Sequence, residues 1–270
     1  MASGLRDRIL TALALAAVII GVLFWMPPTV AVVLIAVTFL LGAWEWAGFA
    51  GLDSPARRAA YVAAIAVGIA LAWRFTAEAA QLTAFLRLTS LWWLVALVWL
   101  VLASQRGGRI AAAAVGFLVL VPAAIGLARL VLVEPNGQEL LLYLLVLIAA
   151  ADAGAYFGGR ALGRHKLAPH VSPGKTWEGL VAGMLCSAAA AVAGAHLFAQ
   201  PLREWVAMCM LVALVSVVGD LVESMFKRRA GLKDSGRLLP GHGGMLDRVD
   251  SLTAAGPMFL LGLYALGIAG

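Results

Sequence analysis

Nine apolar runs alternate with short polar breaks along the chain, and no other pattern in the sequence is as regular. Most of the runs have roughly the 17–25 residues that an α-helix needs to cross the hydrocarbon core of a bilayer. Prolines, glycines and charged residues mark the breaks. The predicted spans are residues 9–25, 29–50, 58–73, 84–102, 111–132, 139–158, 177–199, 204–226 and 248–268. The predicted fold class is all-α, a polytopic integral membrane protein with about nine transmembrane helices.

The composition excludes an ordinary soluble domain, because 63% of the residues are hydrophobic and only 13% are charged. The 20 Lys and Arg residues test the order of the spans, since cytoplasmic loops are enriched in these residues. With the amino terminus placed in the cytoplasm, sixteen of the 20 fall on the cytoplasmic side and four outside. An odd number of spans fits this distribution. Nucleic acid is excluded as a partner, because no large basic domain lies outside the predicted spans.

The position of the acidic residues divides the chain into two regions. Residues 1–136 are predicted to be transmembrane helices that act as a scaffold, with dimer or lipid contacts as candidate roles. Within them, Glu45 lies between Trp44 and Trp46 and is interpreted as an interfacial group among aromatic anchors. Residues 137–270 are predicted to be the catalytic transmembrane region, with cytoplasmic loops at 159–176 and 227–247.

Five acids lie within or beside the apolar runs of the second region. Asp220 and Glu223 end the eighth run, and Asp247 and Asp250 begin the ninth. Residues three apart share a face of a helix, so we expect the two pairs to face each other across one loop. Asp152 lies at the same predicted depth. A carboxylate in hydrocarbon costs at least about 2.5–3.5 kcal/mol, so this convergence predicts a polar cavity that holds cations. Magnesium suits such a site, because it takes few carboxylates and shares phosphate oxygens of a substrate.

The segment between the two acid pairs is basic and rich in glycine. Cations and a flexible backbone directly before a helix start favour phosphate binding. The residues of this kind are Lys227, Arg228, Arg229, Lys233, Arg237, His242, Gly243 and Gly244. The alternative for the basic segment is a topological anchor. The alternative for the acids is that they form salt bridges, with Arg228 and Arg248 as partners.

A second polar feature lies upstream, in DAGAYFGGR (152–160) and SPGKTWEG (172–179). Ser172 and Lys175 predict a phosphate or nucleotide loop that caps the seventh span, although the spacing of a Walker A loop is absent. Gly154 and Gly158 are equally consistent with a simple contact of small residues between helices.

The motifs of the second region resemble a known signature. The chain contains S-x-F-K-R from Ser224, K-D-x-G from Lys233, and L-P-x-H-G-G-M-x-D-R-V-D from Leu239. This order resembles the signature of the phosphatidate cytidylyltransferases, or CDP-diacylglycerol synthases. The resemblance covers residues 140–255, whereas the first half matches only as generic membrane helices.

The resemblance implies transfer of the cytidylyl group of CTP to phosphatidate, giving CDP-diacylglycerol and pyrophosphate. It implies Mg²⁺, with a second cation as an option, in a multi-pass inner-membrane protein whose active site faces the cytoplasm, and a homodimer. The expected metal ligands are Asp220, Glu223, Asp247 and Asp250. The expected catalytic residues are Asp220, Asp247, Asp250 and Lys227. The expected substrate-binding residues are Arg228, Lys233, Asp234, His242, Gly243, Gly244, Arg248, Ser172, Lys175 and Asp152.

Three alternatives stay open at this point. A CTP-dependent lipid kinase of the polyprenol type shares the nucleotide and the membrane substrate. A CDP-alcohol phosphotransferase also clusters aspartates within the membrane, but its DGxxAR start is absent. An ion-coupled transporter would place its acids near the bilayer midplane on broken helices, rather than beside a basic loop.

Overall fold

Long apolar helices form most of the protein in the computed structural model, which describes residues 16–104, 107–236 and 243–269. Seven of the described helices are long and apolar enough to cross a membrane, which confirms a multi-pass architecture. They are α2 (Pro28–Phe49), α3 (Pro55–Phe75), α4 (Ala79–Ala103), α5 (Arg109–Val131), α6 (Gly137–Leu162), α7 (Trp177–Leu197) and α8 (Leu202–Arg229).

The first and last predicted spans are shorter in the described residues. The apolar helix Ala16–Trp25 covers part of the first, and α9 (Asp250–Ala265) covers most of the last. The total of nine spans and the cytoplasmic amino terminus therefore remain predictions.

Proline sets the start of α2 and α3 at two of the breaks that the sequence indicates. Pro28 and Pro55 lie in the first helical turn, where the missing N–H would have no partner within the helix. The hydroxyl of Ser54 accepts a hydrogen bond from the N–H of Arg57 at 3.3 Å. α3 therefore begins three residues before the predicted span 58–73, because its charged first turn is already helical.

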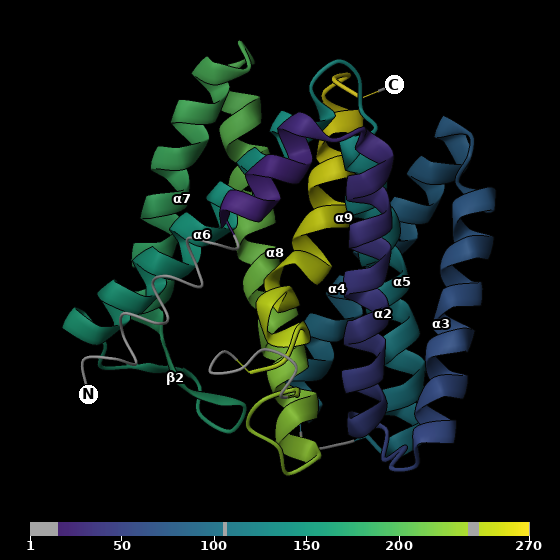
Figure 1. Ribbon diagram of the computed structural model, residues 1–270. Helices are drawn as coiled ribbons and strands as arrows, with labels where there is room; N and C mark the ends of the chain where they lie inside the picture. The colour runs from purple at the N-terminus through teal and green to yellow at the C-terminus, as the bar shows by residue number, and fades with distance from the viewer. Residues whose placement is uncertain (1–15, 105–106, 237–242, 270) are drawn as a thin grey trace.

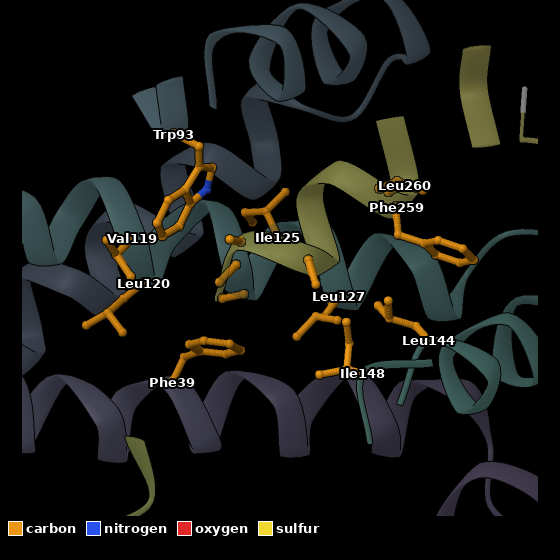
Figure 2. Close-up of a cluster of buried hydrophobic side chains, with 14 of the residues drawn as sticks. Phe39, Trp93, Val119, Leu120, Ile125, Leu127, Leu144, Ile148, Phe259 and Leu260 are labelled. Atoms are coloured by element: carbon orange, nitrogen blue, oxygen red, sulfur yellow. The ribbon is translucent and has the colours of Figure 1, made fainter. Parts of the chain in front are cut away.

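The interior of the bundle is built around α5 and α9, against which the neighbouring helices pack (Figure 1). Figure 2 shows part of this core, in which Phe39 of α2, Trp93 of α4, Leu144 of α6 and Phe259 of α9 lie near Ile125 of α5. Each of these side chains is at most 3% exposed. The core therefore joins helices from both halves of the chain.

The outer helices keep large apolar side chains on their free faces. α3 buries only Tyr61 and Ile65, whereas its Val67 and Leu71 are 57% and 65% exposed. Such a face would be unfavourable in water, but it matches the acyl chains of a bilayer.

Glycine allows α6 and α7 to approach closely. A Cβ added to Gly154 would lie 2.6 Å from Sγ of Cys186, and one on Gly183 would lie 2.7 Å from the carbonyl oxygen of Ala151. A Cβ on Gly158 would overlap the side chain of Ala182. Gly154 and Gly158 thus form the small-residue helix contact that was one of their two interpretations.

The connection between α6 and α7 adds a short β-hairpin to a predominantly helical fold. The expected loop 159–176 is partly a continuation of α6 and partly an antiparallel hairpin of β1 (Lys166–Ala168) and β2 (Ser172–Thr176). The hydroxyl of Thr176 accepts a hydrogen bond from the N–H of Gly179 at 3.1 Å and caps α7. The hairpin connects the neighbouring ends of two closely packed helices. The apolar pattern of the sequence does not encode this short distance.

We expect Gly158→Ala to lower the free energy of unfolding by about 1–3 kcal/mol, because the new methyl group would force α6 and α7 apart. Unfolding by SDS in mixed micelles would measure the change. Gly48→Ala in α2 is the matched control, since its Cβ would have only an ordinary 3.6 Å contact with the flexible Arg58. Equal effects of the two substitutions would contradict the close-packing interpretation.

Candidate active site

The polar features of the second half meet toward one end of the bundle, the lower end in Figure 1. They are the last turns of α8, the β1–β2 hairpin and the 3₁₀ turn η1 (Leu246–Arg248), which leads into α9. α8 contributes a stripe of three charged residues, Asp220, Glu223 and Lys227, at the i, i+3 and i+7 positions. Two separate groups of residues contact the charged side chains of this stripe.

The first group surrounds a cavity of ≈ 500 Å³ between α6, the hairpin, α7 and α8. The lining includes small and apolar residues such as Ala155, Leu180 and Val217. Its polar and charged side chains include Asp152, Tyr156, Arg160, Ser172, Lys175 and Asp220. The cavity therefore combines apolar with charged lining, and it brings three predicted site residues of the hairpin and α6 to Asp220.

An ion pair crosses this cavity. Nζ of Lys175 lies 2.5 Å from Oδ2 of Asp220, and the two side chains are 27% and 22% exposed. The hydroxyl of Ser224 donates to Oδ1 of Asp220 at 3.2 Å. Because both charged groups remain partly accessible, an anion entering the cavity could take the place of Asp220 beside Lys175.

The second group surrounds Lys227, which is 8% exposed. Its Nζ lies 2.7 Å from Oδ1 of Asp247 and 3.1 Å from Oε1 of Glu223. The Glu223 side chain is only 3% exposed. One buried cation is therefore held between two carboxylates from different elements.

The second oxygen of Asp247 binds the backbone of the neighbouring loop. Oδ2 accepts hydrogen bonds from the N–H of Ser235 at 3.0 Å and of Gly244 at 2.9 Å. Burial alone would raise the pKa of Asp247, but the bonds from Lys227 and Gly244 outweigh it and hold the pKa below its ordinary value. Asp247 is thus a permanently ionised partner of Lys227 at neutral pH.

The structure keeps Asp220 and Glu223 on one stripe of α8 but corrects the expected pairing of Asp247 and Asp250 on one helix face. Asp247 lies in η1 and turns toward Lys227, whereas Asp250 is the first residue of α9. Asp220 and Glu223 bind different lysines, Lys175 and Lys227. The backbone bonds of Asp247 explain the difference, because they require a loop at this position rather than the start of a helix.

Asp250 lies within electrostatic range of the acids of the cavity. Its Oδ1 accepts the N–H of Ser251 at 2.7 Å, and its charge interacts unfavourably with those of Asp220 and Asp152. Asp152 and Asp220 also repel each other. A cation near these carboxylates of α6, α8 and α9 would relieve their repulsion. As they stand, no group of three or more acids, histidines or cysteines among the described residues is arranged to hold a metal ion.

Other predicted substrate-binding residues lie at the surface. Arg228 is exposed, and to the described residues it makes only long hydrogen bonds of 3.4 Å, to the carbonyls of Val171 and Leu232. Lys233, Asp234 and Arg248 are exposed as well. In the described part of the chain, Lys175 and Lys227 rather than Arg228 form the ion pairs with Asp220, Glu223 and Asp247.

The glycine loop is described only at its end. Gly243 has a φ of 82°, which favours glycine, and Gly244 is buried beside Ser235 and Glu45. His242 lies outside the described residues.

Two residues at this site escaped the sequence analysis. Glu178 at the start of α7 accepts the N–H of Arg164 at 3.1 Å and contacts Nδ1 of His165 at 2.6 Å, which fixes the base of the hairpin. Glu45 was interpreted as an interfacial group, and this was wrong: its side chain is 3% exposed and accepts hydrogen bonds from the loop that precedes η1. The available signal was a carboxylate inside an apolar run, the same signal that identified the acids of the second half.

Comparison with known proteins is consistent with this geometry. The model of a family described as the cytidylyltransferase family matches residues 6–266. The chain is 42% identical over 270 residues to a phosphatidate cytidylyltransferase of Pseudomonas aeruginosa, covering 97% of this chain and 98% of that protein. It is 38% identical over 282 residues to one of Haemophilus influenzae, covering 94% and 97%. It is also 42% identical over 227 residues to one of Brucella suis, covering 73% and 81%.

We expect Lys227→Met to lower the free energy of unfolding by about 3–5 kcal/mol, because it leaves two buried carboxylates without their cation. The adjacent Arg228→Met is the matched control, since this exposed side chain makes only long hydrogen bonds. Its effect should stay within about 0.5 kcal/mol. Unfolding by SDS in mixed micelles compares the two variants, and a small effect at Lys227 would argue against its role in the charge cluster.

Proposed function

Because the chain belongs to the cytidylyltransferase family, we propose that it transfers the cytidylyl group of CTP to phosphatidate, giving CDP-diacylglycerol and pyrophosphate. The cavity beside the Lys175–Asp220 pair carries this proposal. It offers both apolar and charged lining residues to one ligand, which suits a lipid with a phosphate headgroup.

Phosphatidate fits the cavity in one orientation. Its phosphate would lie beside Lys175 and Arg160, and its glycerol and acyl groups would contact the apolar lining residues Leu180 and Val217. Lys175 is already paired with an anionic oxygen of Asp220, so the phosphate would replace one oxygen ligand by another.

The nucleophile needs little activation. The second pKa of a phosphate monoester is about 6, so the headgroup of phosphatidate is largely dianionic at neutral pH and no general base is required. The contribution of the protein is to neutralise charge and to hold the attacking oxygen in line with the α-phosphorus of CTP. Lys175 orients the lipid phosphate, and Lys227 holds Glu223 and Asp247 in place beside the site.

Magnesium remains part of this proposal. Asp220 and Asp250, with Asp152 nearby, are the residues that fit the ion best, because Glu223 and Asp247 are both bound to the buried Lys227. Magnesium commonly uses one or two carboxylates plus water and substrate phosphate oxygens, so a cluster of three protein ligands is not required. When bound, the ion would supply charge neutralisation at the phosphates of CTP.

The wider setting follows the same proposal. Nine spans with a cytoplasmic amino terminus would place this end of the bundle at the inner face of a bacterial cytoplasmic membrane, where CTP is available. A homodimer is proposed as the assembly.

We expect purified protein to move label from CTP labelled at the α-phosphorus into lipid, and to do so only with Mg²⁺ present. Cytidylyl transfer places this phosphorus in the lipid product, whereas a lipid kinase would leave it in CDP. Chromatography of the lipid and aqueous phases after incubation with phosphatidate separates the two reactions. Label that remains in CDP would refute the proposed function, and undiminished turnover in EDTA would refute the metal.

We expect Lys175→Gln to lower kcat/KM for phosphatidate by about 100-fold, because a charged donor to the lipid phosphate is lost. Lys166→Gln is the matched control, since Lys166 is an exposed lysine on the other strand of the same hairpin. Steady-state kinetics in mixed micelles would measure both variants. An equal response of the two lysines would remove Lys175 from the lipid site.

A further inference from the structure

Glu45 connects the first half of the chain to the proposed active site. It lies in the last turns of α2, about 200 residues before the loop it contacts, and its side chain is 3% exposed. Oε1 accepts the N–H of Met245 at 3.0 Å. Oε2 accepts the N–H of Leu246 at 2.8 Å and the hydroxyl of Ser235 at 2.9 Å. Both oxygens of a buried carboxylate thus receive charge-assisted hydrogen bonds.

These bonds join the two ends of one loop. Ser235 precedes the loop, and Met245 and Leu246 follow it, so Glu45 holds both ends at once. Asp247 makes the same connection from the other side, because its Oδ2 accepts the N–H groups of Ser235 and Gly244. Ser235 therefore donates its hydroxyl to one carboxylate and its N–H to the other.

The packing around this clamp leaves little freedom. A Cβ on Gly236 or Gly244 would overlap the carboxylate of Glu45. Leu246 is fully buried, and a Cβ on Gly42 of α2 would contact it at 3.4 Å. One helical turn along α2, the ring of Trp46 packs on Phe226 of α8 with centroids 5.5 Å apart. α2 therefore fixes η1 and the end of α8 relative to each other.

We propose that Glu45 is a positioning residue for cytidylyl transfer: it holds the base of the loop so that Asp247 stays aligned with Lys227. Glu45 acts through the backbone N–H groups of Met245 and Leu246 and through the hydroxyl of Ser235. The inference rests on the proposed function, and it assigns to the first half of the chain a part in the active site.

The Glu45→Gln variant tests this role. The amide keeps the size of the side chain but presents an NH₂ group to donors that need an acceptor. We expect kcat to fall by about 10- to 100-fold, because displacement of a catalytic group by about 1 Å costs up to this factor. The KM for phosphatidate should change little, since the cavity beside Lys175 does not include the clamp. Hydrogen exchange should rise at residues 243–247 but not in α6 or α7.

A second variant and a control make the result decisive. Ser235→Ala removes one donor to Glu45, so the double variant should lose less activity than the product of the two single losses. Thr89→Val is the control, because Thr89 is a buried polar residue of the first half whose hydroxyl donates to Phe85 within α4. It should leave the exchange of residues 243–247 unchanged.

Two results would overturn the proposal: kcat within about twofold of wild type for Glu45→Gln, or exchange that rises equally in all helices, as expected for general destabilisation. The exchange measurement needs no substrate. It therefore tests the clamp even if the wild-type protein fails to label lipid from CTP, which would count against the proposed function alone.

Discussion

A carboxylate inside a bilayer requires a partner, and this constraint organises the polar end of the protein. α8 carries Asp220, Glu223 and Lys227 at membrane depth on one stripe. Glu223 and Lys227 pair at 3.1 Å, and Nζ of Lys227 also binds Asp247 of η1 at 2.7 Å. The remaining acid, Asp220, recruits Lys175 from the hairpin. The two segments between the helices thus fold back onto α8 because α8 presents charges that they can neutralise.

The two ion-pair groups differ in burial, and this difference separates their roles. Lys227 and Glu223 are nearly inaccessible, so their pairing is a permanent part of the fold. Lys175 and Asp220 are about a quarter exposed and line a cavity. A pair of this kind can exchange one partner for an incoming anion without leaving a buried charge alone. The same helix therefore supplies a fixed cluster and an adaptable one, two turns apart.

Much of the fold could be predicted from the sequence because a helix that crosses a bilayer must be long and apolar. Spans of the required length and apolarity predicted α2 to α8, and the prolines at positions 28 and 55 lie at two of the predicted breaks. Asp152, Lys175 and Asp220 were found for the same reason, since polar residues within or beside apolar runs need an explanation. The β-hairpin was missed because three- and five-residue strands leave no periodic signal.

The errors at the site have one physical origin. Helical spacing predicts which side chains share a face, but it cannot show that a carboxylate will bind backbone N–H groups instead. Asp247 does this and ends the helical pattern, so it separates from Asp250. Glu45 does the same across two halves of the chain. A buried carboxylate that accepts N–H groups stabilises a loop as firmly as packing stabilises a helix. In this protein the irregular backbone at the site is therefore determined by acids on neighbouring elements, and the position of an acid in an apolar run marks where such a loop will be held.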